Sequence, residues 1–150
     1  MRTVALRLLT VRARGFEDLA RTLERRGFAK AAVRAALERL RGEGWQDDES
    51  AAKSIVRARG GRYGRARILR ELSALGFAKE TVAASLADAG ETEQKALARA
   101  FGTVWKRSEN LPMPARRRRV RASLARRGFA AEAISAMMKG SDEEEDLDIG

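Results

Sequence analysis

The sequence predicts an all-α protein made of three tandem three-helix repeats, arranged as an elongated, curved, solenoid-like array with a disordered acidic C-terminal tail. A Gly-Phe pair recurs at positions 27, 76 and 128, and the spacings of 49 and 52 residues are typical of a supersecondary unit. The helix formers Ala, Leu, Arg and Glu dominate, and the 150 residues include only two prolines. A sheet protein would need more turn-forming and more β-branched residues than this chain contains.

Apolar residues recur at fixed distances from each of these glycines. A leucine lies four residues before each one, at Leu23, Leu72 and Leu124, and other apolar residues lie eight before, six after and ten after. Such steps correspond to whole helical turns. A glycine fits the left-handed C′ position that ends a helix, and the Phe after it can fold back onto the last turn. Each repeat therefore has a structural corner between two helices, formed by Gly27 and Phe28, by Gly76 and Phe77, and by Gly128 and Phe129.

The first two repeats are predicted to span residues 1–42 and 43–89. In the first, there is room for a helix over about 3–13 before the helix that ends at the corner. The second follows a short linker at 42–46 and begins with a helix over 48–59. Asp47 is the expected N-cap of that helix, because its side chain can accept from the free N–H groups of the first turn.

The third repeat is predicted to span residues 90–140, after a linker at 88–92. Its first helix is expected over 92–107, and Pro112 and Pro114 stop that helix and open the next one. Each repeat is too small to bury a good core alone. Neighbouring repeats are therefore expected to pack on one another, as in a solenoid.

The chain contains no Cys and no His. This removes disulfides, thiol nucleophiles, imidazole bases and most zinc sites, so we expect no enzyme activity, no metal and no cofactor. Arg7 interrupts the apolar run at the N-terminus, which argues against a signal peptide. No apolar run approaches the ~18 residues of a membrane span. We therefore expect a cytoplasmic monomer without a membrane segment.

The charge is distributed unevenly along the chain. The net charge is +10, but the tail at 141–150 has six acids and no base, and removing those six negative charges leaves +16 on residues 1–140. A body this basic attracts polyanions or an acidic protein face. The tail is expected to be a disordered solubility segment. The alternative is that it folds back on the basic surface and weakens binding.

The densest basic segment, residues 57–70, holds six arginines and no acid. Glycines at 60, 61 and 64 let its backbone turn sharply and approach a partner closely. Because the planar arginine fork pairs bidentately with phosphates and carboxylates, we interpret the segment as a partner-binding ridge rather than a solvated helix face. The candidate residues are Lys53, Arg57, Arg59, Arg62, Tyr63, Arg65, Arg67 and Arg70.

A second basic segment begins just after the proline pair. Four consecutive arginines cover every side of a helix, so some of their stems are expected to lie over Val120 and Leu124 instead of facing a partner. The candidate residues here are Arg116, Arg117, Arg118, Arg119 and Arg121.

Aromatic residues argue against base stacking as the main mode of binding. Three of the eight aromatic residues are used in the corners, and Phe101 and Trp105 fit the core stripe of a helix. Trp45 is expected to plug the linker, with a partner contact as the alternative. Tyr63 is the one ring that is placed to stack on a base, and the sequence leaves open whether it does.

Three stretches, residues 5–29, 44–82 and 116–134, resemble the RecX family of bacterial recombinase regulators. The middle stretch is the most specific, with two aspartates and an alanine after a short linker, a turn rich in Gly and Arg, and then the Leu and Gly-Phe pattern. The resemblance implies three three-helix repeats in an elongated, curved molecule. It also implies binding along the groove of the RecA–single-stranded DNA filament, and a role in DNA repair and the SOS response.

The expected function is therefore that of a non-enzymatic regulator that binds this filament and inhibits ATPase activity, filament growth and strand exchange. Direct binding of the protein to DNA is a further hypothesis. The alternative is a stand-alone basic helical-repeat protein that binds nucleic acid without a recombinase. Its affinity for naked DNA would fall steeply with salt, because such binding depends on counterion release.

Overall fold

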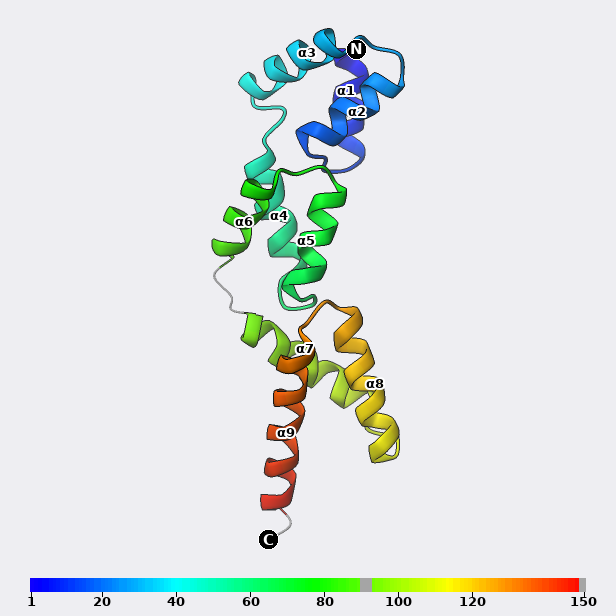
Figure 1. Ribbon diagram of the computed structural model, residues 1–150, viewed down its shortest axis with the longest axis vertical. Coiled ribbons are helices and arrows are strands. Elements are labelled where there is room, and N and C mark those ends of the chain that lie inside the picture. The colour runs from blue at the N-terminus through cyan, green and yellow to red at the C-terminus, as the bar shows by residue number, and fades with distance from the viewer. Residues whose placement is uncertain (90–92, 149–150) are drawn as a thin grey trace. The chain divides into compact units, whose positions relative to one another are not determined.

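The structure, a computed structural model, describes residues 1–89 and 93–148, with side chains described up to residue 141. Within these residues it contains nine α-helices and no strand (Figure 1). The helices are α1 (Arg2–Val11), α2 (Phe16–Arg25), α3 (Lys30–Gly42), α4 (Asp48–Arg59), α5 (Arg65–Ala74), α6 (Lys79–Ala87), α7 (Glu93–Arg107), α8 (Met113–Arg126) and α9 (Ala131–Asp148). The prediction of an all-α chain of three-helix repeats is confirmed.

The helix ends follow the predicted signals closely. The predicted bounds of α4 are correct, and Asp47 caps it by accepting from the Ser50 N–H over 3.1 Å. This hydrogen bond lowers the pKa of the Asp47 carboxyl. The helix α1 ends two residues earlier than predicted, because Arg12 is already extended, with φ −159° and ψ 155°. Pro112 is the N-cap of α8, as expected from the proline pair.

All three corners form as the sequence predicts. The corner glycines have φ values of +92° (Gly27), +79° (Gly76) and +87° (Gly128), which is the left-handed region. In each corner the phenylalanine N–H donates to the carbonyl of the leucine five residues earlier, over 3.2–3.3 Å, and the glycine N–H donates three residues back. This is the Schellman arrangement, which satisfies carbonyls that a helix end would otherwise leave unpaired.

The described chain divides into two compact units. Unit 1 comprises residues 1–58 and 69–89, and the described part of unit 2 comprises residues 59–68 and 93–148. The turn before α5 therefore belongs with the third repeat rather than with the rest of its own repeat. Contact between the second and third repeats, which the sequence predicts, is therefore made by this turn within unit 2.

The core of unit 1 includes a cluster of four leucines and one valine from α2 and α3. Leu19, Leu23, Val33, Leu37 and Leu40 are each at most 1% exposed. They occupy the apolar stripes on either side of the first corner. Burial of such side chains contributes roughly 1.5–3 kcal/mol each, so this stripe pairing supplies much of the local stability.

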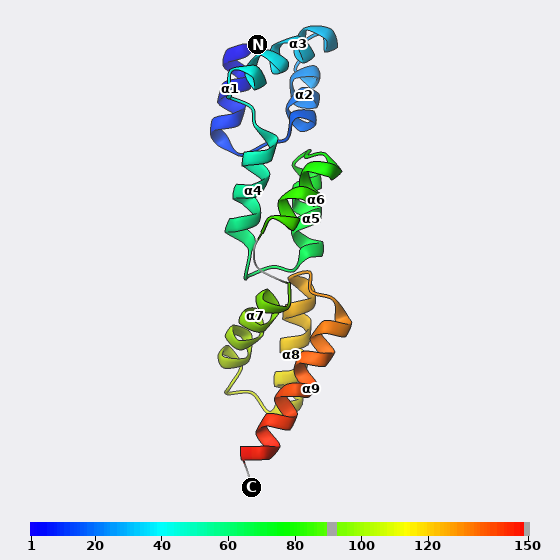
Figure 2. The same ribbon diagram turned by 90° about the vertical axis from the view of Figure 1, so that its left-hand side faces the viewer.

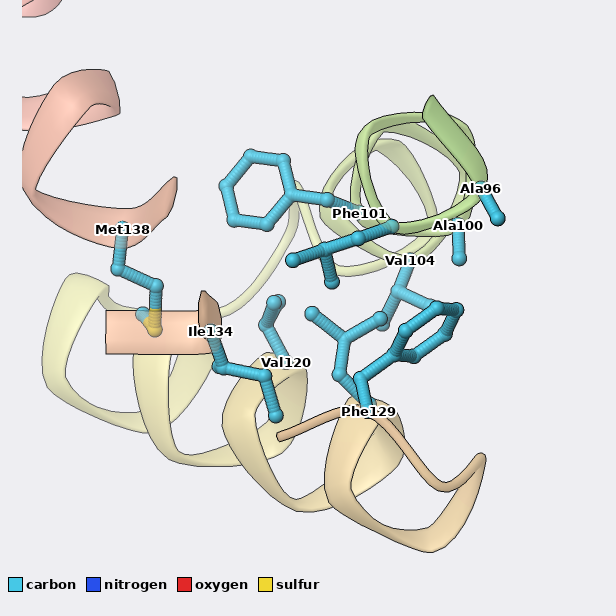
Figure 3. Packing of buried hydrophobic residues seen from close by; sticks show 10 residues of the cluster. Ala96, Ala100, Phe101, Val104, Val120, Phe129, Ile134 and Met138 are labelled. Atoms are coloured by element: carbon cyan, nitrogen blue, oxygen red, sulfur yellow. The ribbon is translucent and has the colours of Figure 1, made fainter. Parts of the chain in front are cut away.

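The core of unit 2 lies between α7, α8 and α9, which lie side by side (Figure 2). Phe101 from α7, Val120 from α8 and Ile134 from α9 converge in the cluster, together with Phe129 of the third corner (Figure 3). Phe129 is 5% exposed. The corner phenylalanine therefore packs into the core of its own repeat.

The helix α9 continues past residue 140 into the acidic segment and ends at Asp148. The side chains of residues 142–150 lie outside the described residues. Both expectations for the tail, a disordered solubility segment or a contact with the basic surface, concern these residues.

Candidate partner-binding surface

A glycine joins the first repeat to the second. Gly15, which precedes α2, is buried against the corner glycine Gly76, and a Cβ atom at Gly15 would overlap the Gly76 carbonyl. The Gly15 N–H donates to the carbonyl of Leu75 over 2.7 Å. A Cβ at Gly76 would lie 2.6 Å from the backbone nitrogen of Asp18. Neither glycine therefore has room for a side chain, and we call this arrangement the first joint.

A carboxylate completes the first joint. Asp48, the first residue of α4, accepts from the Phe16 N–H over 3.1 Å. The Gln46 side chain, 2% exposed, donates to Asp48 over 2.6 Å and to the Arg14 carbonyl over 3.1 Å. Burial raises the pKa of the Asp48 carboxyl, while the Phe16 N–H acts in the opposite direction. The linker before α4 is thereby fixed to the start of α2.

The second joint, within unit 2, repeats this arrangement. Gly64, which precedes α5, donates its N–H to the Arg127 carbonyl over 2.6 Å, and a Cβ at Gly64 would overlap the carbonyl of the corner glycine Gly128. The N–H of Arg65 donates to the Glu93 carboxylate over 3.1 Å. Glu93 is the first residue of α7, as Asp48 is of α4. The two joints therefore use equivalent positions.

The joint residues were not predicted from the sequence. A signal was present, because Gly15 and Gly64 are 49 residues apart, which is also the spacing of the first two corner glycines. Each lies 12 residues before the corner glycine of its own repeat. The equivalent position in the third repeat is Arg116, so the pattern has only two members.

Four candidate arginines of the first basic segment are exposed and have no hydrogen bond or ion pair from their side chains within the described chain. They are Arg57 and Arg70 in unit 1, and Arg62 and Arg65 in unit 2. Exposed guanidinium groups that pair with no side chain in the described chain keep all their donors for a partner.

Three other candidates of this segment have contacts within the protein. The Arg67 guanidinium lies 4.1 Å from the Tyr63 ring centroid, and its Nη1 donates to the Arg126 carbonyl over 3.2 Å. Its Cβ also lies against Gly128. Arg59 lies over the same tyrosine ring at 5.8 Å. Tyr63 is thus covered by arginine, and Arg67 holds the second joint rather than standing free.

Lys53 is paired with two carboxylates. Its Nζ lies 2.8 Å from Glu49 and 3.2 Å from Asp88. The hydrogen bonds that Lys53 donates to these carboxylates raise its pKa. Its charge is therefore largely compensated within unit 1.

The arginines of α8 divide into two groups, those with contacts inside the protein and those that are exposed. Arg116 donates to the Trp105 carbonyl over 3.0 Å and lies 3.8 Å above the Trp105 ring, so that it caps the end of α7. Arg117 is partly buried. The remaining three, Arg118, Arg119 and Arg121, are exposed and have no side-chain partner within the described ranges.

The expectation that Trp45 plugs the linker is wrong, because its side chain is 59% exposed. Gly44 has φ +79° and the Trp45 N–H donates to the Leu40 carbonyl over 2.9 Å, so the backbone itself closes the end of α3. Gln46 takes the buried position in this linker. An amide fits there because polar groups of both the backbone and Asp48 need partners.

No cluster of three or more acidic side chains in the described residues is arranged to hold a metal ion. No helix in that part of the chain is long and apolar enough to cross a membrane.

Comparison with known proteins places this geometry in a family. No family model matches the chain. The regulatory protein RecX of Xanthomonas campestris pv. campestris (strain B100) is 40% identical over 136 residues, which cover 87% of this chain and 80% of the relative. The regulatory protein RecX of Pseudomonas fluorescens (strain SBW25) is 36% identical over 147 residues, which cover 95% and 92%.

Solved structures show the same fold. The crystal structure of RecX from Lactobacillus salivarius matches with a TM-score of 0.74 over 94% of both chains, at 18% identity. Another crystal structure of regulatory protein RecX matches with a TM-score of 0.70 over 92% of this chain and 73% of that one, at 21% identity. Because the curated relatives share more than a third of their residues over most of both lengths, the chain belongs to the RecX family of regulatory proteins.

Proposed function

We propose that this chain is a non-enzymatic, cytoplasmic regulator that acts as a monomer, binds the groove of the RecA–single-stranded DNA filament and inhibits its ATPase activity, growth and strand exchange. Membership of the RecX family supports the regulatory role. The single structural observation that carries the binding mode is a set of exposed arginines without partners in the described chain. They are Arg57, Arg62, Arg65, Arg70, Arg118, Arg119 and Arg121.

Within unit 2 these arginines are held at fixed spacing. The second joint fixes Arg62 and Arg65 to the third repeat, which carries the three free arginines of α8. A guanidinium binds the phosphates of DNA and the carboxylates of a protein equally well, so one surface can contact both components of a filament.

Inhibition of the recombinase follows if one chain bridges successive subunits of the filament. Each exposed ion pair is worth only about 0–1 kcal/mol, but contacts on one chain add through effective concentration once the first has formed. A chain that contacts successive recombinase subunits restrains their relative movement. ATP turnover and end growth both need such movement, so we expect both to fall together.

The proposal is tested by titrating the protein into a recombinase ATPase assay on single-stranded DNA. We expect dose-dependent suppression by the native chain. A variant in which Arg62, Arg65 and Arg70 are changed to Ala should suppress less, and so should one with Arg118, Arg119 and Arg121 changed to Ala. Arg67 is kept in both variants, because its loss would disturb the second joint.

A matched control removes the same charge from elsewhere. Arg7, Arg39 and Lys106 are exposed, and changing all three to Ala lowers the net charge by the same amount. This control should suppress the ATPase as the native chain does. Equal loss in all three variants would indicate a bulk charge effect. Equal affinity for naked DNA and for the filament would favour the stand-alone nucleic-acid binder instead.

A further inference from the structure

The corner of the first repeat is open, whereas those of the second and third are occupied. Gly76 and Gly128 are buried by the two joints, and a Cβ on either would meet the backbone of the joined helix. Gly27 is exposed, and a Cβ there would meet no atom within 4 Å. Phe28 is also only partly buried, unlike the phenylalanines of the other two corners.

The backbone of the open corner has the same form as that of the occupied ones. Gly27 has φ +92°, and the Phe28 N–H donates to the Leu23 carbonyl over 3.3 Å. In the occupied corners, the residue before the glycine accepts an N–H from the incoming glycine. The equivalent carbonyl belongs to Arg26, and no described residue donates to it. The first corner therefore presents, on exposed residues, a carbonyl without a described donor and a surface without side-chain bulk.

A second copy of this chain has no described segment that fits. The two glycines that fill corners, Gly15 and Gly64, are both already used within their own chain. The corresponding N-cap in the third repeat is Pro112, which has no N–H to donate. The phosphate backbone of a nucleic acid does not fit either, because phosphate oxygens are acceptors and the open carbonyl needs a donor.

We propose that the open corner at Arg26–Phe28 docks a partner protein by the same glycine contact, with a glycine at the start of a partner helix donating its N–H to the Arg26 carbonyl. This proposal rests on the proposed function. The partner protein is the recombinase, and the segment that docks is the start of one of its helices. The contact is not ionic. It gives the interaction a component that depends on shape and backbone geometry, beside the salt-sensitive component from the arginines.

The test is the affinity of the Gly27→Asn variant for recombinase assembled on labelled single-stranded DNA. Asn tolerates the left-handed region, and its side chain would occupy the space that an incoming glycine needs. Gly44→Asn is the matched control, because Gly44 has φ +79° and a Cβ there also meets nothing within 4 Å. We expect Gly27→Asn to bind about tenfold more weakly than Gly44→Asn, a loss of about 1.4 kcal/mol. The two variants should have similar helicity and melting temperature.

Salt separates this contact from the arginine contacts. The loss in Gly27→Asn should be the same at low and high salt, whereas the loss in the arginine variants should shrink as salt screens the charges. A photocrosslinking residue at position 26 should also capture the recombinase more efficiently than one at Ala35, an exposed position on α3.

The outcomes distinguish the two proposals. Equal affinities of the two asparagine variants, or equal crosslinking from positions 26 and 35, overturn the docking corner while leaving the proposed function intact. Failure of the native chain to bind the filament at all contradicts the proposed function itself.

Discussion

Gly15 lies so close to Gly76 that a single methyl group at Gly15 would overlap the Gly76 carbonyl. The two residues are 61 positions apart in the sequence, and Gly64 and Gly128 make the same contact in unit 2. Each repeat is thus joined to the next by two glycine backbones in direct contact. Overpacking such a contact is costly, because backbone on both sides leaves nothing flexible to move away.

The second joint can be tested by Gly64→Ala. We expect the free energy of unfolding to fall by about 2 kcal/mol or more, because the new methyl group forces the turn off the third corner. Urea unfolding followed by circular dichroism measures the change. Gly102→Ala is the control in the same unit: Gly102 lies within α7 with open space around it, and alanine there should raise stability by about 0.5–1 kcal/mol. Equal effects of the two changes would contradict the joint.

The corners were predictable from the sequence, whereas the joints were not. A corner is local: the glycine, the phenylalanine after it and the leucine four before it all lie within two helical turns. Their spacing alone therefore indicates the structure. A joint forms between a glycine of one repeat and the corner of the next. No local sequence pattern indicates which glycine packs against which corner. Only the recurrence of a glycine 49 residues later hinted that Gly15 had a counterpart.

The candidate binding residues show the same division. The sequence identified the basic segments, but not which arginines stay free. Arg65 and Arg67 are two positions apart in one run, yet Arg65 is exposed while Arg67 contacts Tyr63 and the Arg126 carbonyl. The difference arises from the second joint, which brings the third corner beside Arg67 only. Composition cannot reveal which guanidinium meets a carbonyl from a helix about 60 residues away.

Arg116 is predicted to stabilise the third repeat rather than to bind a partner. It satisfies the Trp105 carbonyl near the end of α7 and stacks on the Trp105 ring. Arg116→Ala should lower the free energy of unfolding by about 1–3 kcal/mol, since both contacts are lost. Arg116→Lys should restore little of it, because an ammonium cannot combine two in-plane donors with stacking. Arg119→Ala, at an exposed position of the same helix, should change stability by less than about 0.5 kcal/mol.

Asp47 gives a stability change that depends on pH. Its pKa is lowered mainly by the Ser50 N–H, so the folded protein favours the ionised form more than the unfolded chain does. The resulting stabilisation is present at neutral pH and is lost as pH falls from about 4, the ordinary aspartate range, through the lower folded value. Asp47→Ala should cost about 1 kcal/mol at pH 7, and the cost should shrink in acid. Asp47→Asn keeps a capping oxygen without the charge, so its cost at pH 7 should be smaller than that of Asp47→Ala, and it should also shrink in acid because both variants lose the titrating carboxyl. A cost for Asp47→Ala that is constant between pH 7 and pH 2 would contradict the charged cap.

The two tryptophans should differ sharply in their access to solvent. Trp45 is 59% exposed, whereas Trp105 stacks on Phe101 with ring centroids 5.3 Å apart and is covered by Arg116 on its ring. Acrylamide should therefore quench the emission of Trp105→Phe, which retains Trp45, much more steeply than that of Trp45→Phe. Trp45→Phe should leave the unfolding free energy within about 0.5 kcal/mol of the native value, because its ring buries little surface. Similar quenching in the two variants would mean that Trp45 is buried after all, as the sequence suggested.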